Sequence, residues 1–495
     1  MTRPTKALVL GGGPAGLTAA RLLAESRKFA EGGVALVEAA SEVGGWIASE
    51  RRAGSGALFE RGPHSMRLRT TGSGPRTARV LEEVGLASRA LAASSAAADR
   101  YVYVSGGRGL VRLPNSALGL LLEPMTRWLP LEALREVARF DSRAGRERLR
   151  REHQRQRDAH GGSQDVSVRD FFADRFSERT ANEIVAAIVA GVFAGDAAKL
   201  SMSSCFPDLA VRATNGSLVA DVALNRTKPA TTPVTNALTT AASVSFPDGM
   251  AELVRALRAA AERAGVRLST GSAAGAGELA RDPGTGEWVL RGERYSHVAS
   301  TIPVRGLRAA LGADAPPSLA ALEAALGRVD VAVVNLHYAD ERPSVRAFGH
   351  LVPAAGVQRE TGALGVLYDS IAFPAQQPRS LLDAGGSVVS VMLGGAHASW
   401  IAREPRDALI YHAAAVARHQ AGFTREPVDA LAALHEDCIP QYAVGHPRLA
   451  ANAKRDLFAR NLLLLGTGVS GVGLSDALGR TAREVELWLV HAVAA

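Results

Sequence analysis

Cysteine is scarce in this 495-residue chain, which contains only Cys205 and Cys438. Two cysteines that lie so far apart in sequence exclude a disulfide framework and a cysteine-based zinc cage. The low content is typical of a protein from a reducing compartment, and it also suits a protein that is indifferent to redox conditions. We expect both side chains to be buried apolar groups, and we predict no metal site.

The chain also lacks a long hydrophobic run. A transmembrane helix requires about 20 mainly apolar residues, whereas the longest uncharged stretch, residues 229–247, is rich in Thr and Ser and contains three prolines. The shorter segment 117–130, ALGLLLEPMTRWLP, places Trp128 beside Arg127. An aromatic ring next to a cation is typical of a segment that lies in a bilayer interface. The same segment also fits a buried loop and helix, so both interpretations stay open.

Positive charge is concentrated in one place. The formal net charge is +8, and residues 143–157, RAGRERLRREHQRQR, contain seven Arg and two Glu, a balance of +5 that leaves +3 for the other 480 residues. A nucleic-acid-binding protein usually carries its basic residues along a whole face, so we expect no nucleic-acid partner. The basic stretch fits a solvated loop or insertion, and contact with anionic lipid head groups is the alternative.

The first motif is the segment 6–23, KALVLGGGPAGLTAARLL. The run ALVL suits a buried parallel strand, and helical spacing begins after the glycines. The pattern G-x-G-x-x-G places a pyrophosphate on the N-terminus of that helix. The next strand, VALVE, ends in an acid at the distance of about 20 residues at which ribose is bound. The residues that this motif assigns to a dinucleotide are Gly11, Gly13, Pro14, Ala15, Gly16 and Glu38.

The C-terminal sequence indicates which dinucleotide is bound. Within residues 461–489 the stretch GTGVSG, which begins at Gly466 and ends at Gly471, is a second formal match to the glycine pattern. Only 24 residues follow Gly471, too few for a second unit of about 30 residues. We therefore interpret the segment as the last strand and helix of the first domain. This ending is typical of flavoproteins that bury FAD, with Val472 and Asp476 near the cofactor.

Two further stretches support this interpretation. The glycine pair Gly44 and Gly45, with Trp46 after it, fits a tight passage beside a flavin, and it also fits an ordinary turn. The strand SHVASTIP, residues 296–303 with Thr301 near its end, is expected to rejoin the nucleotide domain after an insertion. The chain offers no separate NADPH domain, which implies that electrons pass to oxygen or another diffusible acceptor.

Nine more motifs follow one another along the chain. They are RGPHSMR (61–67), DRYVYVSGG (99–107), GVFAGD (191–196), LSMSSCFPDL (200–209), AVVNLHY (332–338), FGHLVP (348–353), LGVLYDSIAFP (364–374), VMLGG (391–395) and CIPQYAVGH (438–446). Together and in this order they are far more specific than the glycine pattern. The chain resembles, nearly end to end, the oxygen-dependent protoporphyrinogen oxidases of the animal and fungal type, within the FAD-dependent amine oxidase-like superfamily.

The resemblance implies an activity. That family oxidises protoporphyrinogen IX to protoporphyrin IX in the penultimate step of haem synthesis. Three hydride transfers to FAD are implied, with molecular oxygen as acceptor and hydrogen peroxide as product. The residue inventory suits this reaction, because the flavin supplies the redox chemistry and the protein mainly binds and orients the substrate. We assign no catalytic side chain.

The resemblance also assigns residues to substrate and cofactor. Arg100 is expected to pair with a propionate through its planar guanidinium, and an apolar slot is expected to hold the macrocycle. Without the family context, Arg100 fits a surface ion pair and FGHLVP fits a plain core strand. The substrate-binding residues are Arg100, Gly191, Phe348, Gly349, Leu351 and Met392, the last on the side that faces the flavin. The cofactor-binding residues beyond the first motif are Gly44, Gly45, Trp46, His64, Val266, Thr301, Gly466, Gly471, Val472 and Asp476.

The chain departs from the animal relatives at several positions. His64 stands where those relatives carry Arg, beside the cofactor and the active site, and Ala190 also replaces an Arg. Residues 143–157 form an insertion relative to the animal form. Plant and bacterial relatives also lack the Arg at the position of His64, so activity is still expected. His350, between Gly and Leu on a strand, is expected to be a structural residue rather than a base.

The expected fold is α/β. It consists of a Rossmann-like FAD-binding domain assembled from discontinuous segments, an α+β substrate domain and an α-helical membrane-associated insertion. A chain of this length with 47% hydrophobic and 21% charged residues can form two or three folded units. The expected segments are 1–90, 236–305 and 451–495 for the FAD-binding domain, 91–235 for the helical insertion and 306–450 for the substrate domain.

The resemblance extends to partners and location. It implies protoporphyrinogen IX, molecular oxygen and a membrane lipid surface as partners, and it leaves contact with ferrochelatase and a homodimer open. The animal-like motifs favour a peripheral, monotopic protein of the mitochondrial inner membrane. A bacterial inner membrane is the alternative.

Two other functions remain as alternatives. An amine oxidase or a carotenoid-type dehydrogenase would share the FAD fold. Amine oxidases usually frame the flavin with aromatic residues near the C-terminal motif, however, and the final 40 residues contain only Phe458 and Trp488. The second alternative is a non-catalytic, membrane-associated scaffold that retains an inactive flavin fold.

Overall fold

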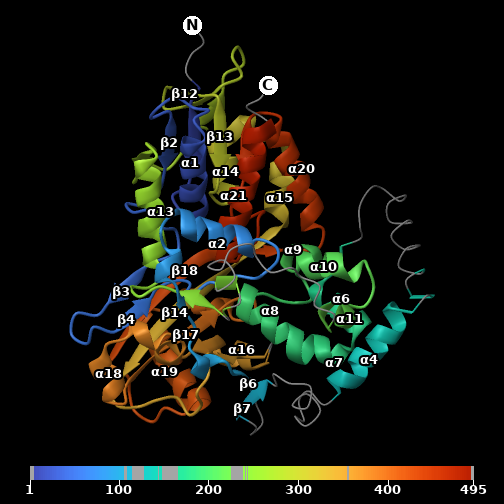
Figure 1. Ribbon diagram of the computed structural model, residues 1–495, viewed down its shortest axis with the longest axis vertical. Helices are drawn as coiled ribbons and strands as arrows, with labels where there is room; N and C mark the ends of the chain where they lie inside the picture. Colours follow the sequence, from blue (N-terminus) through green and yellow to red (C-terminus); the bar gives the residue numbers. More distant parts are fainter. Residues whose placement is uncertain are drawn as a thin grey trace.

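The chain forms three regions. The computed structural model describes residues 5–104, 109–113, 128–142, 144–145, 147, 165–223, 238–239, 241, 243–353 and 356–491. Figure 1 shows a parallel sheet with its helices at the top, a large antiparallel sheet below it, and helices that extend to the right. We call this last region the helical arm and define it as residues 128–142 and 165–223.

Three distant parts of the chain meet in one five-stranded parallel sheet, in the order β19-β13-β1-β2-β9. Its strands are β1 (Ala7–Leu10), β2 (Val34–Val37), β9 (Arg267–Ser269), β13 (His297–Ser300) and β19 (Leu462–Leu464). In the central strand β1, Leu8 pairs with Ala35 on one side and with Val298 on the other. Ser300 of β13 pairs in turn with Leu464 of β19. The first, middle and last parts of the chain therefore share one sheet.

Both faces of this sheet are covered, because its strands are apolar on both sides. Val9 belongs to the core on one face and Leu8 to the core on the other, where Trp288 is fully buried. The helices over the first face are α1 (Pro14–Glu25), α13 (Ala251–Arg263) and α21 (Leu474–His491). The elements over the second face are β10 (Leu279–Arg281), β11 (Trp288–Leu290), β12 (Glu293–Tyr295), α14 (Val304–Leu311), α15 (Pro317–Ala325) and α20 (His446–Phe458).

The second sheet has seven strands in the order β18-β14-β17-β16-β15-β6-β7 and is antiparallel except between β15 and β6. Its strands are β6 (Arg100–Val104), β7 (Gly109–Leu113), β14 (Leu326–Tyr338), β15 (Gly349–Leu351), β16 (Ala363–Leu367), β17 (Ser387–Gly394) and β18 (Asp429–Tyr442). Val389, Val391 and Leu393 of β17 face a core closed by α19 (Arg406–Val416). Because strand residues alternate between faces, Ser390 and Met392 face the opposite side.

Short elements join the two sheets. They are β3 (Ser49–Arg51), β4 (Leu58–Glu60), α2 (Gly74–Glu83), β5 (Leu91–Ala92), β8 (Val244–Ser245), α16 (Gly356–Thr361), α17 (Asp369–Ala372) and α18 (Arg379–Asp383). Asn335 of β14 donates from Nδ2 to the carbonyl oxygen of Glu60 (2.8 Å), and its Oδ1 accepts from the Glu60 N–H (3.2 Å). This buried amide ties β4 to the side of the seven-stranded sheet that carries Met392.

The helical arm contains a buried polar cluster as well as an apolar core. Its helices are α4 (Leu129–Phe140), α6 (Val168–Arg175), α7 (Glu178–Thr180), a π-helical turn (Ala181–Val185), α8 (Ala186–Phe193), α9 (Met202–Cys205), α10 (Pro207–Ala213) and α11 (Leu218–Ala223). Arg175 and Glu136 form a buried ion pair (2.7 Å), and Glu136 also accepts from the Leu218 N–H (2.9 Å). A buried charge pair is stable only when its hydrogen bonds are satisfied, so these contacts hold α4 against α6 and α11.

Several sequence expectations can be compared with this fold. The strands β6 and β7 lie in the segment 91–235, which we expected to be helical, yet they extend the seven-stranded sheet. Both cysteines are free, as expected, but each is only partly buried. Residues 117–127 of the interfacial segment and most of the basic stretch 143–157 lie outside the described residues. No helix among the described residues is long and apolar enough to cross a bilayer.

Candidate cofactor and substrate site

A glycine turn joins β1 to α1. Gly11 has a φ of +98°, which favours glycine, and its N–H donates to the carbonyl oxygen of Val37 (2.9 Å). A Cβ on Gly16 would overlap the carbonyl oxygen of Gly11, so only glycine lets α1 begin this close to β1. Gly13 caps the helix with Pro14 after it, and a Cβ on Gly13 would meet no described atom within 4 Å. The turn therefore leaves the N–H groups at the start of α1 open to an anion.

Glu38 is fixed beside this turn. Its Oε2 accepts from the Gly12 N–H (2.5 Å) and its Oε1 accepts from the Ala40 N–H (2.8 Å). A carboxylate has about four acceptor positions, so it can still accept from ribose hydroxyls. Val266, by contrast, is buried in the core just before β9, and its N–H donates to Ala261. The structure thus brings Glu38 to the turn but not the side chain of Val266.

The ends of β1, β13 and β19 converge at the same edge of the parallel sheet. Thr301 donates both from its N–H (2.9 Å) and from its hydroxyl (2.8 Å) to the carbonyl oxygen of Leu10. A Cβ on Gly466 would lie 2.7 Å from the carbonyl oxygen of Thr301, and Gly466 has a φ of +86°. Gly466 therefore lets the C-terminal segment pass directly over β13, next to the turn at Gly11.

The loop from Gly466 to α21 is held by side chains that the sequence analysis did not assign. Tyr442 donates from its hydroxyl to the carbonyl oxygen of Thr467 and accepts from the Gly471 N–H (3.1 Å). The ring of His446 stacks on Tyr442 with centroids 4.3 Å apart, and its Nε2 donates to Gly468 (3.0 Å). Both residues belong to the motif CIPQYAVGH, which was the available signal.

Asp476 lies in the first turn of α21, where the loop ends. Its Oδ1 accepts from the Ser73 hydroxyl (2.7 Å) and from Arg480 Nε (3.2 Å). A Cβ on Gly471 would lie 2.8 Å from the Asp476 Cβ, and Gly471 has a φ of +99°. Val472, next in the chain, packs against the core of the helical arm. Asp476 therefore ties this loop to the start of α2 as well as facing the loop itself.

The glycine pair lies next to the first turn. Gly44 and Gly45 both have positive φ, the Gly44 N–H donates to Gly12 (2.9 Å), and a Cβ on Gly45 would lie 3.6 Å from the Gly13 Cα. Trp46 follows and is 48% exposed, with its ring edge against His435 of β18 at a centroid distance of 5.1 Å. This contact brings the nucleotide-binding loops to the seven-stranded sheet.

A row of apolar residues crosses the sheet on this same side. Leu351 of β15 pairs with Gly365 of β16, Gly365 pairs with Met392 of β17, and Met392 pairs with Val333 of β14. Paired residues point to the same face, so no side chain of β16 fills the gap between Leu351 and Met392, although Leu351 Cδ2 lies 3.6 Å from the Cβ position of Gly365. A Cβ on Gly191 would overlap Leu351 Cδ2. The structure thus brings together Gly191, Leu351 and Met392, and it adds Gly365, whose signal was the motif LGVLYDSIAFP.

The remaining residues assigned to substrate lie at the β6 edge of the row. Gly349 has a φ of +156°, and Phe348 carries the guanidinium of Arg100 over its ring, 5.7 Å from the centroid. Arg67, which the sequence analysis did not assign to the site, lies close enough to Arg100 for the two positive charges to repel each other. Burial lowers the pKa of Arg67, and the positive charges of Arg100 and Arg69 lower it further. At least two cations therefore gather at this edge.

His64 lies in a buried polar cluster beside the row. Its Nδ1 hydrogen-bonds Asp369 (2.8 Å), whose other oxygen accepts from the Ser390 hydroxyl (2.7 Å). Glu60 accepts from the Ser49 hydroxyl and from the Met250 N–H, both at 2.7 Å. Burial raises the pKa of Glu60 to about 7, although the positive charge of His64 opposes the rise. His350 lies elsewhere in the sheet and has partners at both ring nitrogens, as expected of a structural residue.

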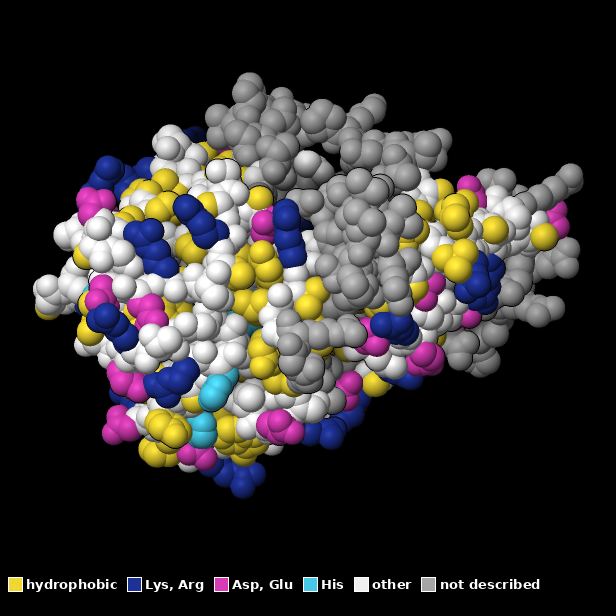
Figure 2. Space-filling model, turned by 90° about the horizontal axis from the view of Figure 1, so that it is seen from below, with side chains coloured by type: hydrophobic (Ala, Val, Ile, Leu, Met, Phe, Trp, Pro, Cys, Tyr) yellow, Lys and Arg dark blue, Asp and Glu magenta, His cyan; other side chains and the backbone are white. Residues whose placement is uncertain are grey.

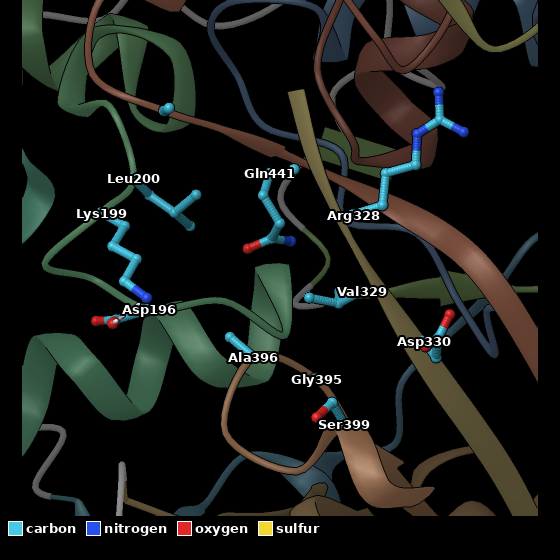
Figure 3. A pocket seen from close by; sticks show the side chains of 12 residues that line it. Asp196, Lys199, Leu200, Arg328, Val329, Asp330, Gly395, Ala396, Ser399 and Gln441 are labelled. Carbon is cyan, nitrogen blue, oxygen red and sulfur yellow. Dashed lines mark ion pairs between the residues drawn. The ribbon is translucent and has the colours of Figure 1, made fainter. Parts of the chain in front are cut away.

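A separate cavity of about 340 Å³ opens between the helical arm and β14 (Figure 3). Lys199 reaches toward Asp196 (3.9 Å) on one wall, and Arg328 and Asp330 lie on the other. The lining residues include none of those assigned to the substrate. The cluster of Ala194, Val329, Val331 and Leu364, against which Met392 packs, separates this cavity from the apolar row.

Comparisons with known proteins agree with these features. Residues 14–477 match the family described as flavin containing amine oxidoreductase. The protoporphyrinogen oxidase of Homo sapiens is 33% identical over 96% of this chain and 97% of its own length, and that of Schizosaccharomyces pombe is 25% identical over 95% and 96%. The protein is an FAD-dependent oxidoreductase, as the sequence predicted.

Solved structures show the same fold. An Exiguobacterium protein provisionally described as a protoporphyrinogen oxidase superposes with a TM-score of 0.72 at 20% identity, covering 98% of this chain and 99% of that one. Cyclohexylamine oxidase from Brevibacterium oxydans superposes with a TM-score of 0.66 at 15% identity, covering 99% and 100%. These likenesses confirm the mixed α/β fold of the FAD-dependent amine oxidase type. The chain therefore belongs to the protoporphyrinogen oxidases, a branch of the flavin-containing amine oxidoreductases.

Proposed function

We propose that this protein oxidises protoporphyrinogen IX to protoporphyrin IX, with FAD as hydride acceptor and molecular oxygen as terminal acceptor, so that hydrogen peroxide forms. The observation that carries the proposal is the apolar row, in which Gly365 separates Leu351 from Met392 on the side of the sheet that the nucleotide-binding loops approach. The human relative, which covers nearly the whole chain, supports the same substrate.

The nucleotide-binding loops fit FAD. The open N-terminus of α1 at Gly13 would hold the pyrophosphate, and Glu38 would accept from a ribose hydroxyl. Gly466 and Gly471, both with positive φ, let the C-terminal loop approach closely, which a side chain would prevent. Bound FAD would supply a hydride acceptor at its isoalloxazine ring. The protein's own task is then to bind the substrate against that ring and to exclude water.

The apolar row suits one face of a flat macrocycle. Neighbouring strands lie about 4.8 Å apart, so Leu351 and Met392 stand on strands about 10 Å apart, and Gly365, which pairs with both, carries no side chain. Val333 at the end of the row is buried. A planar ring system would bury apolar surface here at about 25 cal/mol per Å², and Leu351, backed by Gly191, would limit its sideways movement.

The cations at the β6 edge suit the propionates. Arg100 lies at the start of β6 with its guanidinium over Phe348, and Arg67 lies close by. A guanidinium binds a carboxylate through two parallel hydrogen bonds. We expect Arg100 to bind one propionate and Arg67 to bind the other, which fixes the orientation of the macrocycle in the slot.

Aerobic incubation with protoporphyrinogen IX tests the proposed function. Porphyrin fluorescence and hydrogen peroxide should rise together, with three equivalents of peroxide for each porphyrin because three hydrides are transferred. Porphyrin without peroxide would contradict oxygen as the acceptor. Turnover of primary amines in place of protoporphyrinogen would favour the amine oxidase alternative, which the likeness to cyclohexylamine oxidase supports at the level of fold.

We further propose that the helical arm rests on a membrane surface. Apolar side chains protrude from it: Leu131 (53% exposed), Leu134 (69%), Ile188 (38%), Val192 (55%) and Val211 (64%). Figure 2 shows hydrophobic side chains next to basic ones on the arm, at the right of the view. Trp128 is held within the arm, because its Nε1 donates to Thr180 (3.1 Å) and Arg179 lies 3.4 Å above its ring.

The location and assembly of the protein follow as further proposals. Peripheral attachment to the mitochondrial inner membrane is our first assignment and a bacterial inner membrane the second; fractionation of the source cells distinguishes them. Analytical ultracentrifugation tests the homodimer, and co-sedimentation with ferrochelatase tests that contact. Limited proteolysis tests whether the chain is cleaved preferentially at the boundaries between the expected segments, which are 1–90, 91–235, 236–305, 306–450 and 451–495.

A further inference from the structure

His64 is a buried histidine with an incomplete set of hydrogen bonds. Its side chain is almost inaccessible, and Nδ1 is bonded to Asp369 at 2.8 Å. Its Nε2 is buried and has no partner among the described residues. A buried polar group left without a partner costs about 1–3 kcal/mol. We therefore expect a group from outside the described protein atoms to complete it.

The surroundings of His64 favour its charged form. Burial by itself would lower the pKa of His64, but the Asp369 carboxylate, which also accepts its hydrogen bond, and the Glu60 carboxylate raise it above its ordinary value. Asp369 comes from α17 and Glu60 from β4. The facing residues of β14 and β17 are Asn335 and Ser390, which are neutral.

Other buried histidines lack this combination. His350 hydrogen-bonds Tyr368 and Gln420, and burial lowers its pKa to about 4. His337 also has a buried nitrogen, Nδ1, without a partner in the part of the chain that the structure describes. Burial lowers the pKa of His337 as well, although the charge of Asp429 opposes the fall, and its ring forms no ion pair with any described carboxylate. His64 thus differs from these histidines in two ways: Nδ1 hydrogen-bonds the Asp369 carboxylate, and Nε2 has no hydrogen-bond partner among the described residues.

The position of His64 links it to the redox site. Ser390 pairs with Asn335 two residues along from the Met392–Val333 pair, on the same face, which is about 7 Å along the strand. From the other side, a Cβ on Gly62 would overlap the carbonyl oxygen of Trp46. His64 therefore lies two residues from the point where the nucleotide-binding loops meet the sheet, immediately beside the apolar row.

We propose that His64 is an imidazolium whose Nε2–H donates to the bound flavin and whose charge stabilises the reduced, anionic form of that cofactor. The inference rests on the proposed function, because it requires FAD between the loops and the sheet. Hydride uptake adds negative charge to the flavin ring, and a fixed cation at a dry site stabilises such charge without reorganisation. His64 would then set the reduction potential of the flavin.

The test compares the flavin midpoint potential of the FAD-loaded wild type with that of His64→Gln. We expect the variant to bind reduced FAD 10- to 100-fold more weakly relative to oxidised FAD, a fall in potential of about 30–60 mV for a two-electron couple. The gap should narrow as pH rises, because the wild type then loses the proton of His64. His337→Gln is the matched control, because His337 is a buried histidine on β14 whose Nδ1 has no partner within the described ranges. This variant should leave the potential unchanged.

Equal potentials in folded wild type and His64→Gln would overturn the inference. Should His64→Gln fail to fold, Asp369→Asn provides the second variant, since it keeps the imidazole and removes its carboxylate partner. This variant should lower the potential in the same direction, and an unchanged potential would again contradict the role of His64. A wild type that binds no FAD would overturn the proposed function itself. If the wild type and both variants bind FAD and have equal midpoint potentials, only this inference is overturned.

Discussion

Leu351 Cδ2 occupies the space that a side chain on Gly191 would need, so the backbone of α8 in the helical arm packs directly on the Leu351 side chain of β15. Leu351 is also the residue that faces Met392 across the gap at Gly365. The width of the proposed substrate slot therefore depends on a glycine in a different region of the fold.

Gly191→Ala should narrow the slot. The added Cβ would push the flexible end of Leu351 toward the gap, so we expect the KM for protoporphyrinogen IX to rise at least tenfold, while the FAD content stays at the wild-type level. Steady-state kinetics and flavin absorbance measure the two quantities. Gly306→Ala is the control, because a Cβ on this helical glycine would meet Ile302 at an ordinary 3.6 Å. An unchanged KM for Gly191→Ala would contradict the proposal that Leu351 lines the substrate slot.

Gly13→Val should separate folding from cofactor binding. Gly13 has an ordinary φ of −70° and open space around its Cβ position, so the variant should unfold at the same temperature as FAD-free wild type. Its side chain would fill the space proposed for the pyrophosphate, and the purified protein should be colourless. Thermal unfolding and visible absorbance check the two parts. A yellow Gly13→Val protein would place the pyrophosphate elsewhere.

Arg100→Ala and Arg67→Ala should each raise the KM for the substrate about tenfold, which corresponds to about 1.4 kcal/mol. Flavin content should not change, because neither residue lies at the nucleotide-binding loops. Arg379→Ala, at a side chain that is 93% exposed on α18, is the control for loss of a surface cation. If only Arg100→Ala has an effect, the second propionate is bound by another group or by solvent.

Replacing Leu134 and Val192 with serine should weaken the binding of the protein to anionic liposomes. Both side chains protrude from the helical arm, and each buried apolar side chain contributes about 1.5–3 kcal/mol. Co-sedimentation should therefore fall by at least tenfold. Tyr411→Ser, at a side chain that is 72% exposed on α19, should leave binding unchanged. Equal sedimentation of the wild type, the Leu134/Val192 variant and Tyr411→Ser would contradict the proposal that the helical arm rests on a membrane surface.

Glu60→Gln should change how stability depends on pH. Burial raises the pKa of Glu60 to about 7, above the unfolded value of about 4.3. Its contribution to the free energy of unfolding is therefore fully present below about pH 4.3 and is lost as the pH rises through about 7, a loss of about 4 kcal/mol. The urea midpoint of the wild type should fall relative to that of Glu60→Gln between pH 5 and pH 8. Parallel pH profiles for the two proteins would show that Glu60 stays ionised.

Local sequence was enough to find the nucleotide turn. The contact of Gly16 with Gly11 and the open position at Gly13 are consequences of a strand, a tight turn and a helix that follow one another in the chain. We also expected the C-terminal segment to return to the first domain as its last strand and helix. Its pairing as β19 with β13 in the five-stranded sheet agrees with that interpretation.

Contacts between distant segments could not be predicted from the sequence alone. Ser73 bonds Asp476, and His64 bonds Asp369, across hundreds of residues, and no local pattern marks either pair. We expected the segment that contains β6 and β7 to be helical, and this was wrong. Which strand pairs with the edge of a sheet depends on tertiary packing, which the local sequence does not show. Gly365 was not predicted as a site residue, because the role of a glycine on a strand can be recognised only when its neighbours across the sheet are known.

The sequence by itself determined that this chain binds a dinucleotide and belongs among flavin-dependent oxidases, because phosphate binding at a helix N-terminus depends on residues that are adjacent in the chain. Only the tertiary structure decided which side chains from distant parts of the chain lie next to one another. Two sheets and a helical arm pack together where Gly365 separates Leu351 from Met392 and where Arg67 lies near Arg100. His64 Nε2, which has no partner among the described residues, lies in the same region. These contacts depend on packing, and packing is set by the whole chain at once.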